Sequence, residues 1–278
     1  MRNGPLWLNG DLHAQPPLLA SDRGFLLGDG LFETVLVRYG APVLLSEHLQ
    51  RMRNSALALD FAIPGSFDEQ IAEALDALRV ATGDSASAAL RVTLTRGPGP
   101  RGLGLPEEAH PSLLVQLDSF DPTAASVDSA AIIDTLRIDP LDPLAPHKTT
   151  SALRWVAARQ AARVAGADVA LLRTIDGDIA EADFANLFAV IDGRVVTPPL
   201  ERGVLPGVTR AFVLQALRDE EELVEERPIR SAEVDGASEL FLTSSLIGVR
   251  ALRFVDGGPL PPASPVAESL AAAYARIP

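Results

Sequence analysis

Short apolar runs separated by turn-forming residues dominate the first third of the chain. Residues 6–13 and 32–45 predict strands joined by Asn-Gly and Tyr-Gly-Ala-Pro turns, because branched and aromatic residues are interrupted by residues that tolerate positive φ. Two further runs, residues 87–97 and 111–117, predict more strands of the same lobe. The pattern is typical of hairpins rather than of regular βαβ repeats.

Two stretches between these strands have helical spacing instead. One helix is expected to begin with Ser46 as its N-cap and with Glu47 in its first turn. The second spans residues 66–83, where apolar residues recur at helical intervals before the Gly83 stop. The N-terminal part therefore combines hairpins with two helices.

The composition turns to proline, aspartate, alanine and serine in residues 120–146, which contain a predicted linker and a proline-rich loop. We therefore expect two lobes, residues 1–119 and residues 120–278. After the loop the pattern predicts helices at 151–165 and 209–219 and strands at 168–174, 186–193, 194–198, 223–229 and 239–245. Helices and strands in both lobes predict an α+β fold.

The charge and the composition narrow the possible partners. The formal net charge of −13 and the pI of about 4.7 argue against nucleic acid or an anionic membrane, because the protein's field repels polyanions. There is no cysteine for a disulfide, a thiolate metal site or a thiol nucleophile, and the four histidines lack metal-ligand spacing, so no catalytic metal is expected. Without a signal-peptide core or an apolar run of about 20 residues, a cytoplasmic protein is expected.

Lys148 lies in "PLAPHKTTSAL", between the proline-rich loop and a predicted helix. An ordinary surface lysine is the simplest interpretation. The apolar, loop-bounded setting favours another, because a desolvated amine is pushed toward its neutral, nucleophilic form. Neutral amines form Schiff bases with aldehydes, so Lys148 is a candidate attachment point for an aldehyde cofactor such as pyridoxal phosphate.

Such a cofactor also needs a carboxylate for its pyridine nitrogen and a cradle for its phosphate. Glu181, in "DGDIAEADFANLFAV", follows an Asp-Gly turn among small and apolar residues and is the carboxylate candidate. It would hold a proton on the ring nitrogen and make the ring an electron sink. The alternative is a strand-end glutamate that faces water.

The phosphate cradle is predicted where "GVLPG" turns directly into a helix, because the amides of Val208 and Thr209 can point at an anion along the helix dipole. The hydroxyls of Ser244 and Ser245 and the guanidinium of Arg51 could complete the cradle. Taken singly, the turn is a common loop, the serines are ordinary turn residues and Arg51 is a solvated helix residue.

Arg96 and Arg101 belong to the glycine- and proline-rich stretch "TRGPGPRGLGLP". It lacks the Lys-Ser/Thr ending of phosphate-binding loops, so nucleotide binding is a poor interpretation. An arginine on a shaped loop can instead clamp a substrate carboxylate bidentately. A solvated turn arginine is an equally good alternative.

In combination these segments resemble the fold-type IV pyridoxal-phosphate enzymes, also called class IV aminotransferases, across nearly the whole chain. This family includes branched-chain and D-amino-acid aminotransferases and aminodeoxychorismate lyase. The resemblance implies a homodimer of two-lobed subunits, each with a small N-terminal α/β lobe and a larger C-terminal lobe with a β-barrel-like core. It rests on motifs in family order: "SDRGFLLGDGLFETVLV", "EHLQRMRNSA", "TRGPGPRG", "HKTTSAL", "GDIAEADFANLFAV", "TPPLERGVLPGVTR" and "FLTSSLIGV".

The resemblance also implies a role for each matching residue. Lys148 would hold pyridoxal phosphate as a Schiff base and shuttle the proton, Glu181 would bind the pyridine nitrogen, and Leu205 would pack against the ring. The phosphate would be held by Arg51, Val208, Thr209, Ser244 and Ser245.

The subfamily depends on the substrate site. D-amino-acid aminotransferases hold the substrate carboxylate with a tyrosine, an arginine and a histidine, and the matching positions are Phe32, Arg101 and Leu103. The glycine-rich, methionine-bearing loop of branched-chain aminotransferases has no clear counterpart. "RGPGPRG" and "SSLIGV" look more like aminodeoxychorismate lyase, but Leu103 and Ser244 differ from the residues common there.

Transamination needs only the residues that the whole family shares, whereas the lyase also needs specific recognition of a bulky diacid. We therefore expect a transaminase that acts on a D-amino acid or an (R)-amine, with a 2-oxo acid as acceptor. The alternative is aminodeoxychorismate lyase, which releases pyruvate and 4-aminobenzoate. A third hypothesis is a cofactor-binding protein that has kept the fold without activity.

Overall fold

The computed structural model describes residues 4–15, 17–83, 85–123 and 127–277, which group into two compact units. The first unit comprises the described residues up to Pro122 together with His147–Ala152. The second comprises the described residues of Thr123–Pro146 and Leu153–Ile277. The segment around Lys148 therefore belongs to the first unit, whereas the predicted lobes place it in the second.

Among the described residues, the first unit contains an antiparallel six-stranded sheet with the strand order β2-β1-β6-β5-β3-β4. Two-residue turns with positive φ, Asn9-Gly10 and Tyr39-Gly40, close its two short hairpins and confirm the predicted turns. The strands are β1 (Leu6–Leu8), β2 (Asp11–His13), β3 (Gly30–Arg38), β4 (Ala41–Pro42), β5 (Ser87–Thr95) and β6 (Ser112–Ser119).

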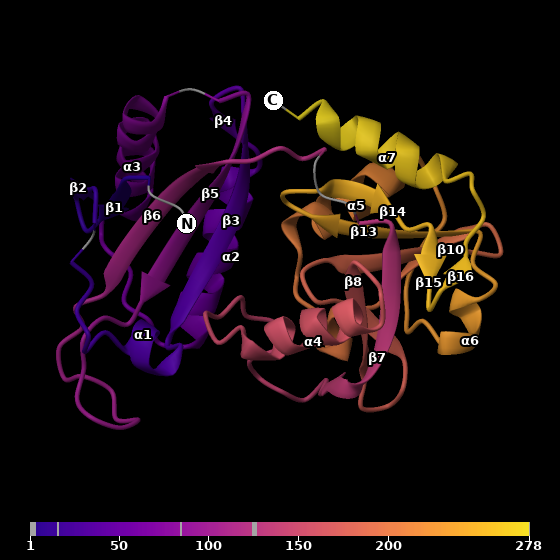
Figure 1. Ribbon diagram of the computed structural model, residues 1–278, viewed down its shortest axis with the longest axis horizontal. Helices are drawn as coiled ribbons and strands as arrows, with labels where there is room; N and C mark the ends of the chain where they lie inside the picture. Colours follow the sequence, from indigo (N-terminus) through magenta and orange to yellow (C-terminus); the bar gives the residue numbers. More distant parts are fainter. Residues whose placement is uncertain (1–3, 16, 84, 124–126, 278) are drawn as a thin grey trace. The chain divides into compact units, whose positions relative to one another are not determined.

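Two helices, α2 (Leu45–Ala58) and α3 (Phe67–Thr82), pack on one face of this sheet (Figure 1). Ile71 and Leu78 of α3 are fully buried against sheet residues such as Val92. The apolar stripe of α3 is therefore what binds this helix to the sheet.

The start of α2 differs from the prediction. The helix begins at Leu45, and its cap residue Leu44 has a left-handed φ of 53° and makes no side-chain cap bond. Ser46 lies inside the first turn, where its hydroxyl donates to the Glu47 carboxylate at 2.7 Å. The tight turn that buries Val43 after β4 sets the helix start, and the local capping preference of Ser46 does not.

The second unit contains, in its described part, a ten-stranded mixed sheet. Its main path runs β12-β11-β10-β9-β8-β7-β15-β16, and β13 pairs with both β10 and β14. The strands are β7 (Ser129–Ile138), β8 (Val169–Thr174), β9 (Ile179–Ala182), β10 (Asn186–Ile191), β11 (Arg194–Thr197), β12 (Val224–Glu226), β13 (Glu239–Ser244), β14 (Gly248–Ala251), β15 (Phe254–Val255) and β16 (Gly258–Pro259).

Strand β10 is buried on both faces, which explains its uninterrupted apolar run. Phe188 packs with helices α5 (Val208–Asp219) and α7 (Pro265–Ala275), and its ring stacks 5.1 Å from that of Phe241. Leu187 faces the opposite core. The described helices include none long and apolar enough to cross a membrane.

Strand β7 lies between the predicted linker and the proline-rich loop, where no strand was predicted. Residues 124–126 of the predicted linker lie outside the described residues. Ala130 packs into one core, while Ala131 and Ile133 pack into another beneath α4 (Leu153–Val164). Small residues buried on both sides give no alternating pattern, and the strand forms through its parallel pairing with β8. Sheets and helices in both units, one sheet antiparallel and one mixed, confirm the α+β fold class.

Candidate functional site

Lys148 lies in a short extended segment that pairs with the beginning of β3. The Phe32 amide donates to the Lys148 carbonyl at 2.9 Å, and the Thr150 amide donates to the Gly30 carbonyl at 2.8 Å. The half-buried side chain of Lys148 places Nζ 4.5 Å from the centroid of the Phe32 ring. A residue held in this way is not an ordinary surface lysine.

The glycines of "GDG" allow this close approach. A Cβ on Gly28 would lie 2.5 Å from Ser151 Oγ and 3.2 Å from its Cα, and a Cβ on Gly30 would lie 2.9 Å from Thr150 Oγ1. Gly28 also has a φ of 68° as the C-cap of α1 (Arg23–Leu27). The turn at residues 28–30 is therefore also the contact surface for the chain after Lys148.

His147 connects the same segment to α2. Its Nδ1 lies 3.0 Å from Ser55 Oγ, one helical turn after Arg51. Burial lowers the pKa of His147 from its ordinary value of 6.5, so the ring is neutral at neutral pH. Lys148 is thus flanked by one anchor to the sheet and one to the helix.

Phe32 is the one predicted substrate-binding residue that the structure places beside Lys148. Its ring also lies 3.9 Å from the Arg91 guanidinium carbon. Arg101 and Leu103 lie instead on an exposed loop, and the Leu103 side chain is 82% exposed. The first unit does not bury these two residues against Phe32.

Arg51 is part of a buried ionic cluster and is not a solvated helix residue. Its Nε and Nη2 donate to the two carboxylate oxygens of Glu33 at 2.7 and 2.6 Å, and His48 Nδ1 lies 2.8 Å from Glu33 Oε2. Burial alone would raise the pKa of Glu33, but the charge of Arg51 and the hydrogen bonds from His48 and Arg51 lower it to about 2. The predicted phosphate role of Arg51 would therefore be shared with this ion pair.

Sequence reasoning missed Glu33 and His48, although the sequence contains a signal for Glu33. Leu31, Glu33 and Val35 alternate along β3, and all three are buried on its helix-facing side. A carboxylate in the apolar register of a strand requires a buried cation, and α2 supplies it.

Glu181 is buried in β9 and is only 4% exposed, so the water-facing alternative is wrong. Its Oε2 accepts from Asn186 Nδ2 at 3.1 Å and from the Leu205 amide at 3.1 Å. Asn186 Nδ2 also donates to the Leu205 carbonyl at 2.8 Å. These bonds fix the carboxylate orientation and couple it to the loop before α5. Asn186 was not predicted, although a polar residue opening a buried apolar strand is a readable signal.

The N-terminus of α5 has the features of an anion cradle. Gly207 caps it without a side-chain bond, and a Cβ there would lie 2.0 Å from Asn186 Oδ1. The amides of Val208 and Thr209 open the helix, where intrahelical acceptors are lacking. Thr209 Oγ1 is buried and has no hydrogen-bond partner among the described residues. A phosphate would supply the acceptors that these donors need.

The two predicted serines lie next to a row of cross-strand neighbours that includes Glu181. Glu181 on β9 pairs with Asn186 on β10, which pairs with Thr243 on β13, and Ser244 ends that strand. Ser244, at the strand end, and Ser245, in the turn that follows, are both half-buried. The second unit thus contains a fixed carboxylate, which can accept from a protonated ring nitrogen, and hydroxyls and helix-start amides, which can donate to a phosphate.

The chain is similar to known proteins over most of its length. The family model described as "Amino-transferase class IV" matches residues 30–254. A Methanocaldococcus jannaschii protein named for the branched-chain-amino-acid aminotransferases is 31% identical over 91% of this chain and 88% of its own length. A D-alanine aminotransferase of Bacillus licheniformis is 28% identical over 85% of this chain and 82% of its own.

A solved structure extends the similarity to the fold. The crystal structure of 4-amino-4-deoxychorismate lyase from Pseudomonas aeruginosa has a TM-score of 0.82 and 29% identity, and the match covers 96% of this chain and 97% of that one. The names of these three relatives denote different activities.

Replacing Gly28 with alanine should lower the free energy of unfolding by about 1–3 kcal/mol, because the added methyl group meets Ser151 and the positive φ strains alanine. Gly10→Ala is the matched control, since Gly10 also has a positive φ but nothing lies within 4 Å of an added Cβ. Urea unfolding measures both variants. Equal losses would contradict the close approach at Gly28.

Glu33 should make stability depend on pH in the acid range. The folded pKa of about 2 lies below the ordinary value of 4.5, so the ionised carboxylate stabilises the fold at neutral pH. This stabilisation is lost as the pH falls from about 4.5 to about 2. The loss corresponds to about 3 kcal/mol. Urea unfolding of Glu33→Gln should show a flatter acid dependence, with about 3–5 kcal/mol lower stability at neutral pH because Arg51 stays buried and unpaired.

The exposed Glu73→Gln of α3 is the control for this measurement and should keep the wild-type acid slope. A Glu33→Gln variant with the same acid slope as the wild type would show that Glu33 is not the group responsible.

Proposed function

Since the chain belongs to the class IV aminotransferase family, a family of pyridoxal-phosphate-dependent enzymes, we propose that it is a transaminase acting through Lys148. It would move an amino group from an amino acid or amine to a 2-oxo acid. We infer a D-amino acid or an (R)-amine as the donor class, supported by the similarity to D-alanine aminotransferase.

The coupling of Glu181 to the loop before α5 carries this proposal. The Asn186 side chain and the Leu205 backbone bond to each other, and both donate to the Glu181 carboxylate. They therefore fix this carboxylate relative to the turn that leads to the first amides of α5. A carboxylate and an anion cradle held at a fixed spacing match the two ends of pyridoxal phosphate.

Each residue of the site would have its own role. Lys148 Nζ would hold the cofactor and then move the donor's α-proton as a neutral amine. Glu181 would keep a proton on the ring nitrogen, and the side chain of Leu205 would pack on the ring. The phosphate would be bound by Arg51, Val208, Thr209, Ser244 and Ser245. When bound, pyridoxal phosphate supplies an aldehyde for the amine and a ring that accepts electrons from the α-carbon.

Recognition of the donor is assigned to Phe32, Arg101 and Leu103. The Phe32 ring beside Lys148 supplies an apolar wall, and the exposed Arg101 guanidinium is available for a carboxylate. Leu103 supplies an apolar contact on the same loop. Arg101 therefore would determine affinity for donors that have a carboxylate.

Aminodeoxychorismate lyase is the second candidate, supported by the similarity to the Pseudomonas aeruginosa lyase. The same proton removal at Lys148 would then lead to release of pyruvate and 4-aminobenzoate, with no net transfer of an amino group. The two activities differ in products, so one set of measurements separates them.

We predict that the protein mixed with pyridoxal phosphate absorbs near about 410 nm, and that D-alanine, D-glutamate or (R)-1-phenylethylamine shifts this absorbance to about 330 nm. Spectra recorded during a single half-reaction test this. If no donor shifts the spectrum while aminodeoxychorismate is converted to pyruvate, the protein is the lyase. A protein that stays colourless with the cofactor is neither.

Lys148 is the only lysine in the sequence, which gives this experiment a direct control. Borohydride reduction should attach the cofactor's mass to the peptide that contains Lys148, and mass spectrometry should find no labelled peptide in Lys148→Arg. A wild-type protein that is labelled elsewhere would contradict the assignment.

Replacing Glu181 with glutamine should lower kcat by about 100-fold or more while the cofactor stays bound, because an amide cannot stabilise the proton on the ring nitrogen. Glu239→Gln is the matched control. Glu239 is also 4% exposed and accepts from two amides, those of Val266 and Ala267. Steady-state kinetics and cofactor absorbance should separate the variants, and equal losses of kcat would indicate general damage to the fold.

A further inference from the structure

Arg23 is an almost fully buried arginine, 4% exposed, at the first position of α1. The residue before it is fixed by the sheet: the Asp22 carboxylate accepts from the Gly24 amide at 2.7 Å, from Thr95 Oγ1 at 3.0 Å and from Ser112 Oγ at 2.7 Å. The backbone just before Arg23 is therefore attached to β5 and β6 by the Asp22 side chain.

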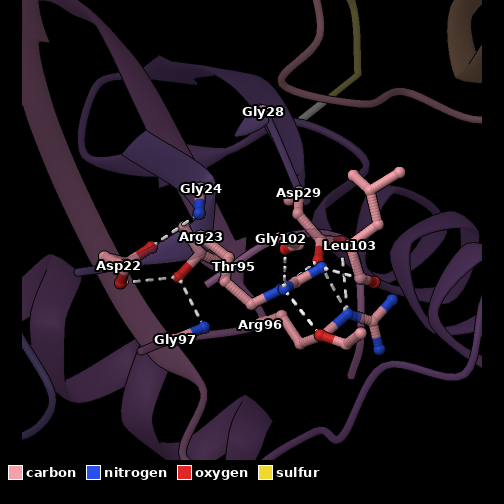
Figure 2. A network of polar contacts seen from close by, with 12 residues as sticks. Asp22, Arg23, Gly24, Gly28, Asp29, Thr95, Arg96, Gly97, Gly102 and Leu103 are labelled. Carbon is pink, nitrogen blue, oxygen red and sulfur yellow. Dashed lines mark hydrogen bonds and ion pairs between the residues drawn. The ribbon is translucent and has the colours of Figure 1, made fainter. Parts of the chain in front are cut away.

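The guanidinium of Arg23 extends from this point to the loop that carries Arg101 and Leu103 (Figure 2). Its Nη1 donates to the carbonyl of Gly104 at 2.9 Å and to that of Gly102 at 3.2 Å. These two carbonyls lie on either side of Leu103, so one guanidinium nitrogen fixes the backbone at the tip of the loop.

The Asp29 carboxylate holds the Nε side of the Arg23 guanidinium, and a second arginine, Arg96, holds that carboxylate. Arg23 Nε donates to Asp29 Oδ2 at 2.7 Å, and Arg96 Nε donates to the same oxygen at 3.0 Å (Figure 2). Arg96 Nη2 in turn donates to the Leu59 carbonyl at 3.0 Å, just after α2. The orientation of Arg23 is therefore determined by the fold and not by the loop.

The loop folds around the Arg23 side chain and has little apolar packing of its own. A Cβ on Gly99 would lie 2.6 Å from Arg23 Cδ, so only glycine allows this contact. On the outer side, Leu103 is 82% exposed and Leu105 is 53% exposed. Removing the bonds from Arg23 would leave the backbone of Arg101 and Leu103 without its main internal support.

We propose that Arg23 is a positioning residue for substrate recognition: it holds the loop backbone so that Arg101 can meet the carboxylate of the substrate. This rests on the proposed function, which assigns the carboxylate to Arg101. Arg23 itself does not touch the reacting atoms. It should therefore affect KM for carboxylate substrates and leave kcat nearly unchanged.

Arg23→Lys is the informative variant, because lysine keeps the positive charge beside Asp29 but lacks the planar fork that reaches the carbonyls. We expect KM for D-alanine to rise about 10-fold, with kcat within about 2-fold of the wild type. KM for (R)-1-phenylethylamine, which has no carboxylate, should not change. Arg23→Lys combined with Arg101→Ala should be no worse than Arg101→Ala alone, because the two residues act on one interaction.

Trypsin gives a readout that does not depend on activity. Arg101 is an exposed cleavage site on this loop, and its cleavage should become several-fold faster in Arg23→Lys. The matched control is Arg53→Lys, which changes an arginine of α2 that pairs with Asp68 and has no contact with the loop among the described residues; both KM and cleavage should stay unchanged.

Three outcomes overturn the proposal. The first is cleavage at Arg101 that is no faster in Arg23→Lys than in the wild type. The second is an equal rise of KM for donors with and without a carboxylate, and the third is a fall in kcat alone. If the wild type converts no amine donor, the transaminase function fails separately. The same KM comparison is then made with aminodeoxychorismate, a diacid, and an unchanged KM in Arg23→Lys overturns the proposal there.

Discussion

The backbone bond between the Phe32 amide and the Lys148 carbonyl connects parts of the chain that lie more than a hundred residues apart, and the candidate site depends on it. The strand that receives Lys148 also contains Glu33, whose ion pair with Arg51 binds α2 to the sheet. It begins at Gly30, where the absence of a side chain lets the segment approach. One strand thus positions the lysine, the aromatic ring beside it and the helix behind it.

Buried charge in this acidic protein is organised around arginine. Arg23, Arg51 and Arg210 are nearly buried, and each donates to a carboxylate: Asp29, Glu33 and Glu226. Arginine suits these positions because its fork makes several directed bonds and does not lose its proton. Lysine can lose its proton, and the sequence contains one, Lys148, at the position where the proposed function requires a neutral amine.

Local patterns predicted those elements whose register is set within a few residues. Helix α3 and the turns at Asn9-Gly10 and Tyr39-Gly40 formed as predicted, because amphipathic spacing and positive-φ residues act locally. Two features were not predicted correctly. The start of α2 is determined by a tight turn and not by Ser46 as N-cap, and β7 has no alternating pattern because it is buried on both faces. These two failures have one cause, which is that tertiary packing overrode the local pattern.

The candidate site also contains residues that the local sequence predicts and contacts that only the tertiary structure determines. Motif order pointed to Lys148 and Glu181, but no spacing in the sequence could give the partners that orient them. The Leu205 amide reaches Glu181 from 24 positions away, and Arg23 reaches the Gly102 carbonyl from 79 positions away. Such contacts follow from strand pairing over long separations, which a pattern in a short window does not contain.

The way Arg23 holds its loop also explains how one architecture can serve several reactions. Its bonds go to the carbonyls of Gly102 and Gly104, and backbone carbonyls are the same whatever side chains the loop carries. The exposed positions Arg101, Leu103 and Leu105 can therefore change without loss of the loop's support. Relatives of this chain are named for a branched-chain aminotransferase, a D-alanine aminotransferase and a lyase. A loop fixed through its backbone and variable in its side chains would let substrate choice change while the amine and the carboxylate proposed for the chemistry stay in place.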